Sequence, residues 1–249
     1  MGLFDLFKSK SKDGGAERKK SGSAAKWAEA AGSKRAQAYD RQEAIQELSK
    51  LGTADAVEAL LKRFTFQIDP SITDQEEKDL AYEGVLKAGK DAIEPVRAFA
   101  GKAESITYPI RIAKELLDDE EELVDELILW LSRWDTEYAK FIDPKLQLLE
   151  ELGNHVNPNI REAVEPFLQD ASDPARFNAV VATLAQKDEA SLEPLLALLL
   201  DEESVRIRTK IADGLVNLGW EIPDDQRDAV RKALPPQFGV DGSGQVTKR

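Results

Sequence analysis

The chain has 249 residues, of which 42% are hydrophobic and 33% are charged, and its net charge is −13 at pH 7. It contains no cysteine, which excludes disulfides, thiolate zinc sites and cysteine nucleophiles. No apolar run approaches the roughly 18 to 20 residues that span a bilayer, and the N-terminus lacks the apolar core of a secretory signal. We therefore expect a cytoplasmic protein. The modest glycine and proline content favours an all-α fold.

The charge is unevenly distributed along the chain. Residues 1–39 carry nine Lys and Arg against four Asp and Glu, whereas residues 40–249 carry 25 against 43. Because an acidic body repels phosphate backbones, we expect no nucleic acid among the partners.

The first ten residues, MGLFDLFKSK, combine an apolar and aromatic cluster with lysines. One interpretation is an interfacial anchor over residues 1–12 that makes peripheral membrane contact. A second is a docking peptide for a groove on a partner. A third is a frayed terminus, or one that folds back on the protein's own helices. The candidate membrane or docking residues are Leu3, Phe4, Leu6, Phe7, Lys8 and Lys10.

Residues 8–38 are rich in Lys, Ser, Gly and Ala, and Trp27 is almost their only large apolar side chain. Such a segment buries too little surface to offset the entropy of ordering. We therefore predict a basic, flexible N-terminal segment over residues 1–38, with a helical patch at 24–31.

From residue 39 onward, apolar residues recur at helical spacing, and glycines close several of the periods. Gly153 and Gly219 are 66 residues apart, or two steps of 33, a period typical of stacked helical pairs. The predicted pairs are 39–51 with 53–64, 73–88 with 91–103, 107–117 with 120–134, 144–152 with 159–168, 174–186 with 189–200, and 202–218 with 224–234.

Two stretches do not follow the helical pattern. Residues 64–72, FTFQIDPSI, alternate apolar with polar side chains and predict an extended loop. Residues 235–249 begin with two prolines and are then rich in Gly, Ser and charge, so we predict a disordered tail.

The second helices of the pairs align with one another as AVEALL, AIEPVR, LVDELI, AVEPFL and SLEPLL. Over residues 39–234 the chain resembles the HEAT repeat, in the variety found in bacterial proteins and phycobilisome-lyase-like repeats. The resemblance implies a right-handed α-solenoid of about six hairpins, with the second helices on the inner face. It also implies a protein-binding scaffold, although a minority of such proteins are enzymes.

The aligned second helices share an acidic position. An acidic ladder of this kind could receive a basic segment of a partner, or the chain's own basic segment. Alternatively, each carboxylate lies in the first turn of its helix and offsets the helix dipole. The candidate partner-binding residues are Glu58, Glu94, Asp125, Glu165 and Glu193.

Aromatic side chains gather in the middle of the chain, where the contact candidates are Trp130, Trp134 and Tyr138. Because the two tryptophans are four residues apart, they share a helix face, and we interpret them as core between repeats rather than a binding hot spot. We expect the segment around Tyr138 to be the more exposed part.

The remaining candidates are single residues. We expect Arg206 to pair with Asp170 or Asp173 of the preceding repeat, and His155 to lie exposed in a loop. One histidine without cysteine cannot supply the usual zinc ligands, and no phosphate-binding loop occurs. We therefore assign no catalytic residue and expect no metal and no cofactor.

These observations favour a non-catalytic interaction scaffold or adaptor that binds another protein, through a basic segment, on an acidic inner face. Its N-terminus would tether it to a membrane or a second partner. The alternative is an accessory lyase or other modifying enzyme of the HEAT-like bilin-lyase type. A DNA-repair enzyme is disfavoured by the acidic body. The sequence leaves the oligomeric state open.

Overall fold

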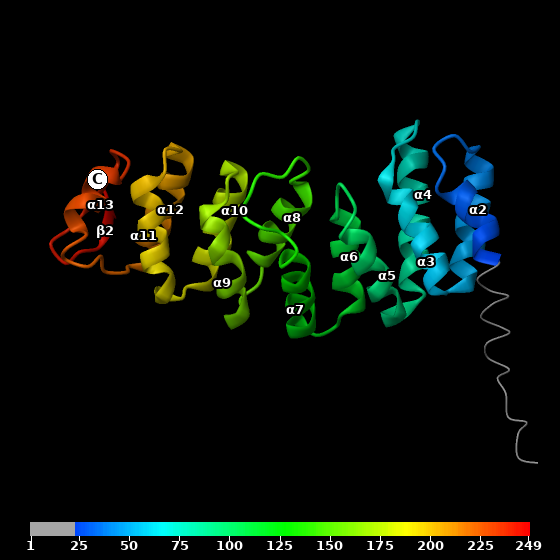
Figure 1. Cartoon of the computed structure of the whole chain (residues 1–249), viewed down its shortest axis with the longest axis horizontal. Helices are drawn as coiled ribbons and strands as arrows, with labels where there is room; N and C mark the ends of the chain where they lie inside the picture. The colour runs from blue at the N-terminus through cyan, green and yellow to red at the C-terminus, as the bar shows by residue number, and fades with distance from the viewer. Residues whose placement is uncertain (1–22) are drawn as a thin grey trace, which may run out of the picture. The chain divides into compact units, whose positions relative to one another are not determined.

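The computed structural model describes residues 23–249 and confirms the all-α class (Figure 1). The N-terminal candidates Leu3, Phe4, Leu6, Phe7, Lys8 and Lys10 lie outside the described residues. The chain divides into two compact units, the first ending at Leu117 and the second spanning Asp118–Arg249.

The described part of the first unit opens with a helix over residues 23–31, which agrees with the predicted helical patch. The elements that follow are α2 (Ala38–Leu51), α3 (Ala54–Leu61), η1 (Lys62–Thr65), α4 (Ser71–Leu86), η2 (Gly89–Ala92), α5 (Ile93–Ala100) and α6 (Thr107–Leu116).

The helices of the first unit form two layers. In one layer, α4 packs between α2 and α6, and in the other α3 packs against α5 (Figure 1). We call these the first-helix layer and the second-helix layer. Apolar side chains fill the space between them, and Ile45, Leu48, Leu60 and Val85 are at most 1% exposed. Each layer covers the apolar face of the other, which is why these short helices are stable.

The second unit repeats this arrangement. Its helices and 3-10 turns are α7 (Glu120–Leu131), α8 (Asp143–Leu152), α9 (Pro158–Val164), η3 (Glu165–Gln169), α10 (Asp173–Gln186), η4 (Glu189–Ser191), α11 (Leu192–Asp201), α12 (Val205–Leu218) and α13 (Arg227–Ala233). The first-helix layer is α8, α10 and α12, and the second-helix layer is α7, α9, α11 and α13.

The third predicted hairpin differs from the others because α6 and α7 belong to different units. Within each unit the paired layers agree with the predicted hairpins, and the continuous six-hairpin solenoid stays a prediction. The extended stretch predicted over 64–72 is shorter than expected, because η1 ends at Thr65 and α4 begins at Ser71.

The prediction of a disordered C-terminal tail is wrong. Strands β1 (Phe238–Val240) and β2 (Val246–Lys248) form an antiparallel hairpin that packs on α12 and α13. Phe238 and Val246 are each 3% exposed, and the side-chain amide of Gln245 donates to the Gly219 carbonyl at 2.7 Å. The polar composition of the tail concealed two apolar side chains that anchor it.

Helices α2, α8 and α12 end at glycines, as the repeat pattern predicts, whereas α10 does not. Gly219 ends α12 with φ of 66°, in the left-handed region that glycine adopts without strain. Thirty-two residues earlier, α10 ends at Lys187 with φ of 55°, so a lysine occupies the position where the repeat pattern calls for glycine.

We predict that Lys187→Gly stabilises the second unit, because it removes the clash between Cβ and the backbone carbonyl in the left-handed conformation. The expected gain in the free energy of unfolding is about 1 kcal/mol, measured by urea denaturation. Lys210→Gly, inside α12, is the control and should lower the free energy of unfolding by about 1 kcal/mol. A loss of stability in Lys187→Gly would contradict the backbone assignment.

Candidate partner-binding surface on the second-helix layer

The five predicted carboxylates all lie on second-layer helices or the turns that continue them. Four of them are exposed, namely Glu58, Glu94, Asp125 and Glu193. The fifth, Glu165, has a half-buried side chain that is 19% exposed. The first unit brings together the first two, and the second unit carries the other three.

Their positions within the helices are not equivalent. Glu94 and Glu193 are the second residues of α5 and α11, where a carboxylate offsets the helix dipole as predicted. Glu58 and Asp125 are the fifth and sixth residues of α3 and α7, beyond the first turn. The dipole explanation is therefore wrong for these two, and their acidic character has no such local cause.

In the first unit, one of the two carboxylates is already engaged. Glu94 accepts from Arg97, one turn later on α5, at 2.5 Å. Among residues 23–249, no hydrogen bond or ion pair involves the Glu58 carboxylate. Glu58 is therefore available to an external cation.

In the second unit, a single arginine neutralises part of the surface. The guanidinium of Arg161 on α9 lies 3.0 Å from Glu165, 3.3 Å from Glu162 and 2.9 Å from Asp188. Because Asp188 caps η4, immediately before α11, this arginine links neighbouring second-layer helices.

The other two carboxylates of the second unit are less engaged. The Asp125 carboxylate accepts one long contact from Asn159, at 3.5 Å. Glu193 makes no ion pair or hydrogen bond with the described residues. The second unit therefore presents two free or weakly engaged carboxylates, besides the three that share Arg161.

The negative charge of the protein is concentrated in the second unit. Residues 118–249 carry 28 Asp and Glu against 14 Lys and Arg, whereas residues 23–117 carry 16 against 14. A surface with this imbalance attracts cationic ligands over distances of about the Debye length.

The two tryptophans are packed inside the second unit. Trp130 is 3% exposed, and its indole N–H donates to Glu126 at 2.5 Å. Trp134 is half-buried, with the ammonium of Lys145 5.8 Å from its ring centroid. These placements agree with the core interpretation. Tyr138, by contrast, is 83% exposed and remains a contact candidate.

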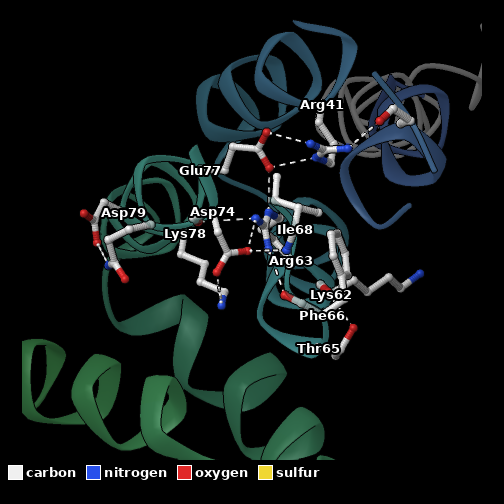
Figure 2. A network of polar contacts seen from close by, with 12 residues as sticks. Arg41, Lys62, Arg63, Thr65, Phe66, Ile68, Asp74, Glu77, Lys78 and Asp79 are labelled. Carbon is white, nitrogen blue, oxygen red and sulfur yellow. Dashed lines mark hydrogen bonds and ion pairs between the residues drawn. The ribbon is translucent and has the colours of Figure 1, made fainter. Parts of the chain in front are cut away.

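Buried ion pairs, which the sequence analysis did not identify, join the elements of the first unit (Figure 2). Glu77 on α4 is fully buried and accepts from Arg41 on α2 at 2.7 and 2.9 Å, and from Arg63 in η1 at 2.8 Å. Arg63 also donates to Asp74 at 2.7 Å, and Lys78 donates to the other oxygen of the same carboxylate. The network fixes α2, η1 and α4 to one another.

A related arrangement recurs in the second unit. Lys145 on α8 pairs with Asp170 at 2.6 Å, and Arg176 on α10 pairs with Glu202 at 2.7 and 3.0 Å. In each case a cation near the start of a first-layer helix meets a carboxylate in the turn that closes the following second-layer helix. From the sequence we expected an ion pair between neighbouring repeats at Arg206 instead.

That assignment is wrong. Arg206 is the second residue of α12 and lies over the ring of Phe177, 3.6 Å from its centroid, rather than against Asp170 or Asp173. The position that matches Arg176, the fourth residue of its helix, is Arg208. The Nε of Arg208 is buried and has no hydrogen-bond partner among residues 23–249.

His155 is less exposed than predicted. Its two ring nitrogens lie 3.1 Å from Glu120 and 3.2 Å from Glu151, and its side chain is 12% exposed. In residues 23–249 there is no group of three or more His, Cys, Asp or Glu side chains arranged to hold a metal ion.

The structure also shows a groove that the sequence analysis missed. It has a volume of about 650 Å³ and lies beside α3, η1 and α5, with Phe64, Pro95, Ala98 and Phe99 among its lining residues. These side chains come from elements separated by about 35 residues, so no local pattern indicates that they meet.

No protein-family profile matches the sequence, and no curated protein matches it significantly.

The membrane expectation can be examined for the described helices. None of the helices within residues 23–249 is long and apolar enough to cross a bilayer.

We predict that Glu77→Gln strongly destabilises the first unit, because it leaves two buried guanidinium groups without their carboxylate. The expected loss is about 3–5 kcal/mol of unfolding free energy, measured by urea denaturation. Glu76→Gln is the matched control, since Glu76 is exposed on the same helix, and it should change stability by less than about 0.5 kcal/mol. Equal effects of the two substitutions would contradict the network.

We predict that acid destabilises the second unit through Glu202. Burial alone would raise the pKa of this carboxyl, but hydrogen bonds from Arg176 and from the backbone of Ser204 and Glu203 hold the pKa below its ordinary 4.5. A lowered pKa contributes stability above pH 4.5 that is lost as the pH falls through the folded-state value. In urea denaturation between pH 7 and pH 3, Glu202→Gln should flatten the loss of unfolding free energy. Glu203→Gln, at an exposed neighbour, should leave the slope unchanged.

Proposed function

We propose that this protein is a non-catalytic interaction module that holds a lysine- or arginine-rich segment of a protein partner against the second-helix layer of its second unit. The observation that carries the proposal is the twofold excess of carboxylates in residues 118–249, together with Asp125 and Glu193 exposed on that layer. The resemblance to HEAT repeats supports it, since arrays of paired helices mostly serve as binding scaffolds.

The contacts within the unit indicate which carboxylates would act. Glu165 is half-buried and already forms an ion pair with Arg161, so it is less accessible to an external cation than an exposed carboxylate. Asp125 and Glu193 have no such neutralising neighbour. A cationic segment that meets these two would add an interaction without breaking one.

The energy of such an interaction is distributed over many weak pairs. Each exposed ion pair contributes about 0.2–1 kcal/mol and is screened by salt. The affinity of the complex should therefore fall as the salt concentration rises. The concentrated negative charge should act mainly on the association rate.

The N-terminal basic segment extends this proposal. In that role, the apolar cluster at Leu3 to Phe7 would bring the module to a membrane or to a second protein, as the sequence suggests.

We predict that Asp125→Lys with Glu193→Lys weakens binding of a fluorescein-labelled peptide containing six lysines among Ser and Gly. The expected loss is about tenfold in Kd at 50 mM salt, measured by fluorescence anisotropy, because two attractive pairs become repulsive. The same variant should retain fewer partners in an affinity pull-down from the native host followed by mass spectrometry.

The matched control is Asp224→Lys with Asp225→Lys, which changes the net charge equally at exposed positions before α13. Equal weakening by both double variants would show that net charge alone attracts the peptide, and would overturn the proposed surface. Stoichiometric binding of a tetrapyrrole would instead support the accessory-lyase alternative.

A further inference from the structure

The groove of the first unit is lined by apolar and by charged side chains. We call Phe64 and Phe99 its aromatic floor, and the exposed charged residues Glu58, Lys62, Lys102 and Glu104 its rim. Of the lining residues, Pro95, Ala98 and Phe99 belong to α5, and Phe64 and Thr65 belong to η1. Among the charged lining residues, Glu58 is on α3 and Lys62 is the first residue of η1, while Lys102 and Glu104 lie in the turn after α5. A volume of about 650 Å³ is sufficient for a few large side chains.

The aromatic floor is fixed in position by the surrounding fold. Phe64 stacks on Tyr108 of α6, with ring centroids 4.1 Å apart and planes inclined by 9°. Tyr108 in turn lies edge-on to Tyr82 of α4. One face of Phe64 is thereby covered, while the residue as a whole stays half-buried beside the groove. Phe99 is likewise half-buried. A rigid, partly covered aromatic surface is suited to receive apolar side chains.

The helix over residues 23–31 ends next to a residue of this groove. Gly32, just after the helix over residues 23–31, approaches Lys62 so closely that a Cβ on Gly32 would lie 3.2 Å from the Lys62 Cβ. Lys62 itself lines the groove. Because a helix rises 1.5 Å per residue, Ser23 lies within about 15 Å of Gly32. The ten residues 13–22 can span up to about 35 Å, so residues 3–12 can reach the groove.

Residues 3–12 combine apolar side chains, which suit the apolar lining of the groove, with lysines, whereas the charged lining residues are two glutamates and two lysines, Lys62 and Lys102. Leu3, Leu6 and Phe7 have the spacing that places side chains on one helix face, the pattern with which amphipathic segments enter grooves between helices. Lys8 and Lys10 follow directly and would meet the acidic groups at the rim, Glu58 and Glu104.

We propose that residues 3–12 of this chain dock in the groove beside α3, η1 and α5, with Leu3, Leu6 and Phe7 on the aromatic floor. The segment and its site belong to one chain, so the effective concentration is of the order of millimolar even if the contact is weak. Docking covers the apolar cluster and occupies Glu58, and a membrane or partner that takes up the segment must first displace it.

The absence of cysteine allows a direct test in the full chain. The variant Ser9→Cys with Ser105→Cys places one thiol in the segment and one at the groove. The control variant, Ser9→Cys with Glu43→Cys, places the second thiol at an exposed position of α2 in the other layer. Under mild oxidation, the groove pair should form an intramolecular disulfide at least tenfold faster than the control pair. Each rate is normalised to the reaction of the same thiols with glutathione.

Two further substitutions test the docking chemistry without disturbing the core. Adding Leu6→Ser with Phe7→Ser, or adding Ala98→Glu in the groove, should reduce the rate for the groove pair to that of the control pair. Ala54→Glu, exposed at the start of α3 and outside the groove, is the matched control and should leave the fast rate unchanged.

Three results would overturn the proposal. The first is equal cross-linking of the two thiol pairs. The second is cross-linked dimers whose yield rises with protein concentration, which would assign the groove to a second copy of the chain. The third is cross-linking at the control rate together with Phe7-dependent binding to phosphatidylserine-containing vesicles, which would assign the segment to a membrane.

Discussion

The first unit depends on one buried carboxylate. Glu77 lies between the guanidinium groups of Arg41 and Arg63, and the three side chains are at most 3% exposed. Removing such charges from water is costly unless each one is paired and hydrogen-bonded, so displacing one of these elements against another would leave a buried charge unpaired. This network sets the position of η1, and η1 in turn presents Phe64 to the groove. Buried charge in the first-helix layer therefore determines the shape of the surface on the opposite layer.

Much of the fold could be predicted, because helical periodicity and stop signals are local properties of the chain. The C-terminal ends of α8, α10 and α12 coincide with the predicted ends. The buried charges could not be predicted, because a glutamate or a lysine in an amphipathic helix is normally expected to face solvent, and nothing in the local sequence distinguishes Glu77 and Lys145 from exposed residues. The C-terminal hairpin was not predicted for a related reason, because it is anchored by two apolar side chains that pack on helices earlier in the chain.

The candidate surface was predicted from an alignment of the second helices, but in the structure its carboxylates occupy different positions within their helices. The shared acidic position does lie on the second-helix layer. What alignment could not show is which carboxylates are already neutralised, because Arg161 reaches Asp188 across 27 residues. Nothing in the sequence indicated the groove, because its lining combines residues of α3, η1, α5 and the turn after α5. Local pattern thus located the layer, and long-range pairing decided which of its groups are free.

The unpaired Arg208 bears on how an array of this kind changes length. Lys145, Arg176 and Arg208 follow one another at intervals of 31 and 32 residues, and only the first two meet a carboxylate. A tandem duplication of residues 173–204 would add one more arginine together with its own carboxylate, the pair formed by Arg176 and Glu202, and would leave Arg208 as the last position before the terminal hairpin. Such growth requires no redesign of existing contacts. The number of repeats is then set by the point at which the terminal hairpin covers the last helix, so evolution or a designer can lengthen the module by moving that cap.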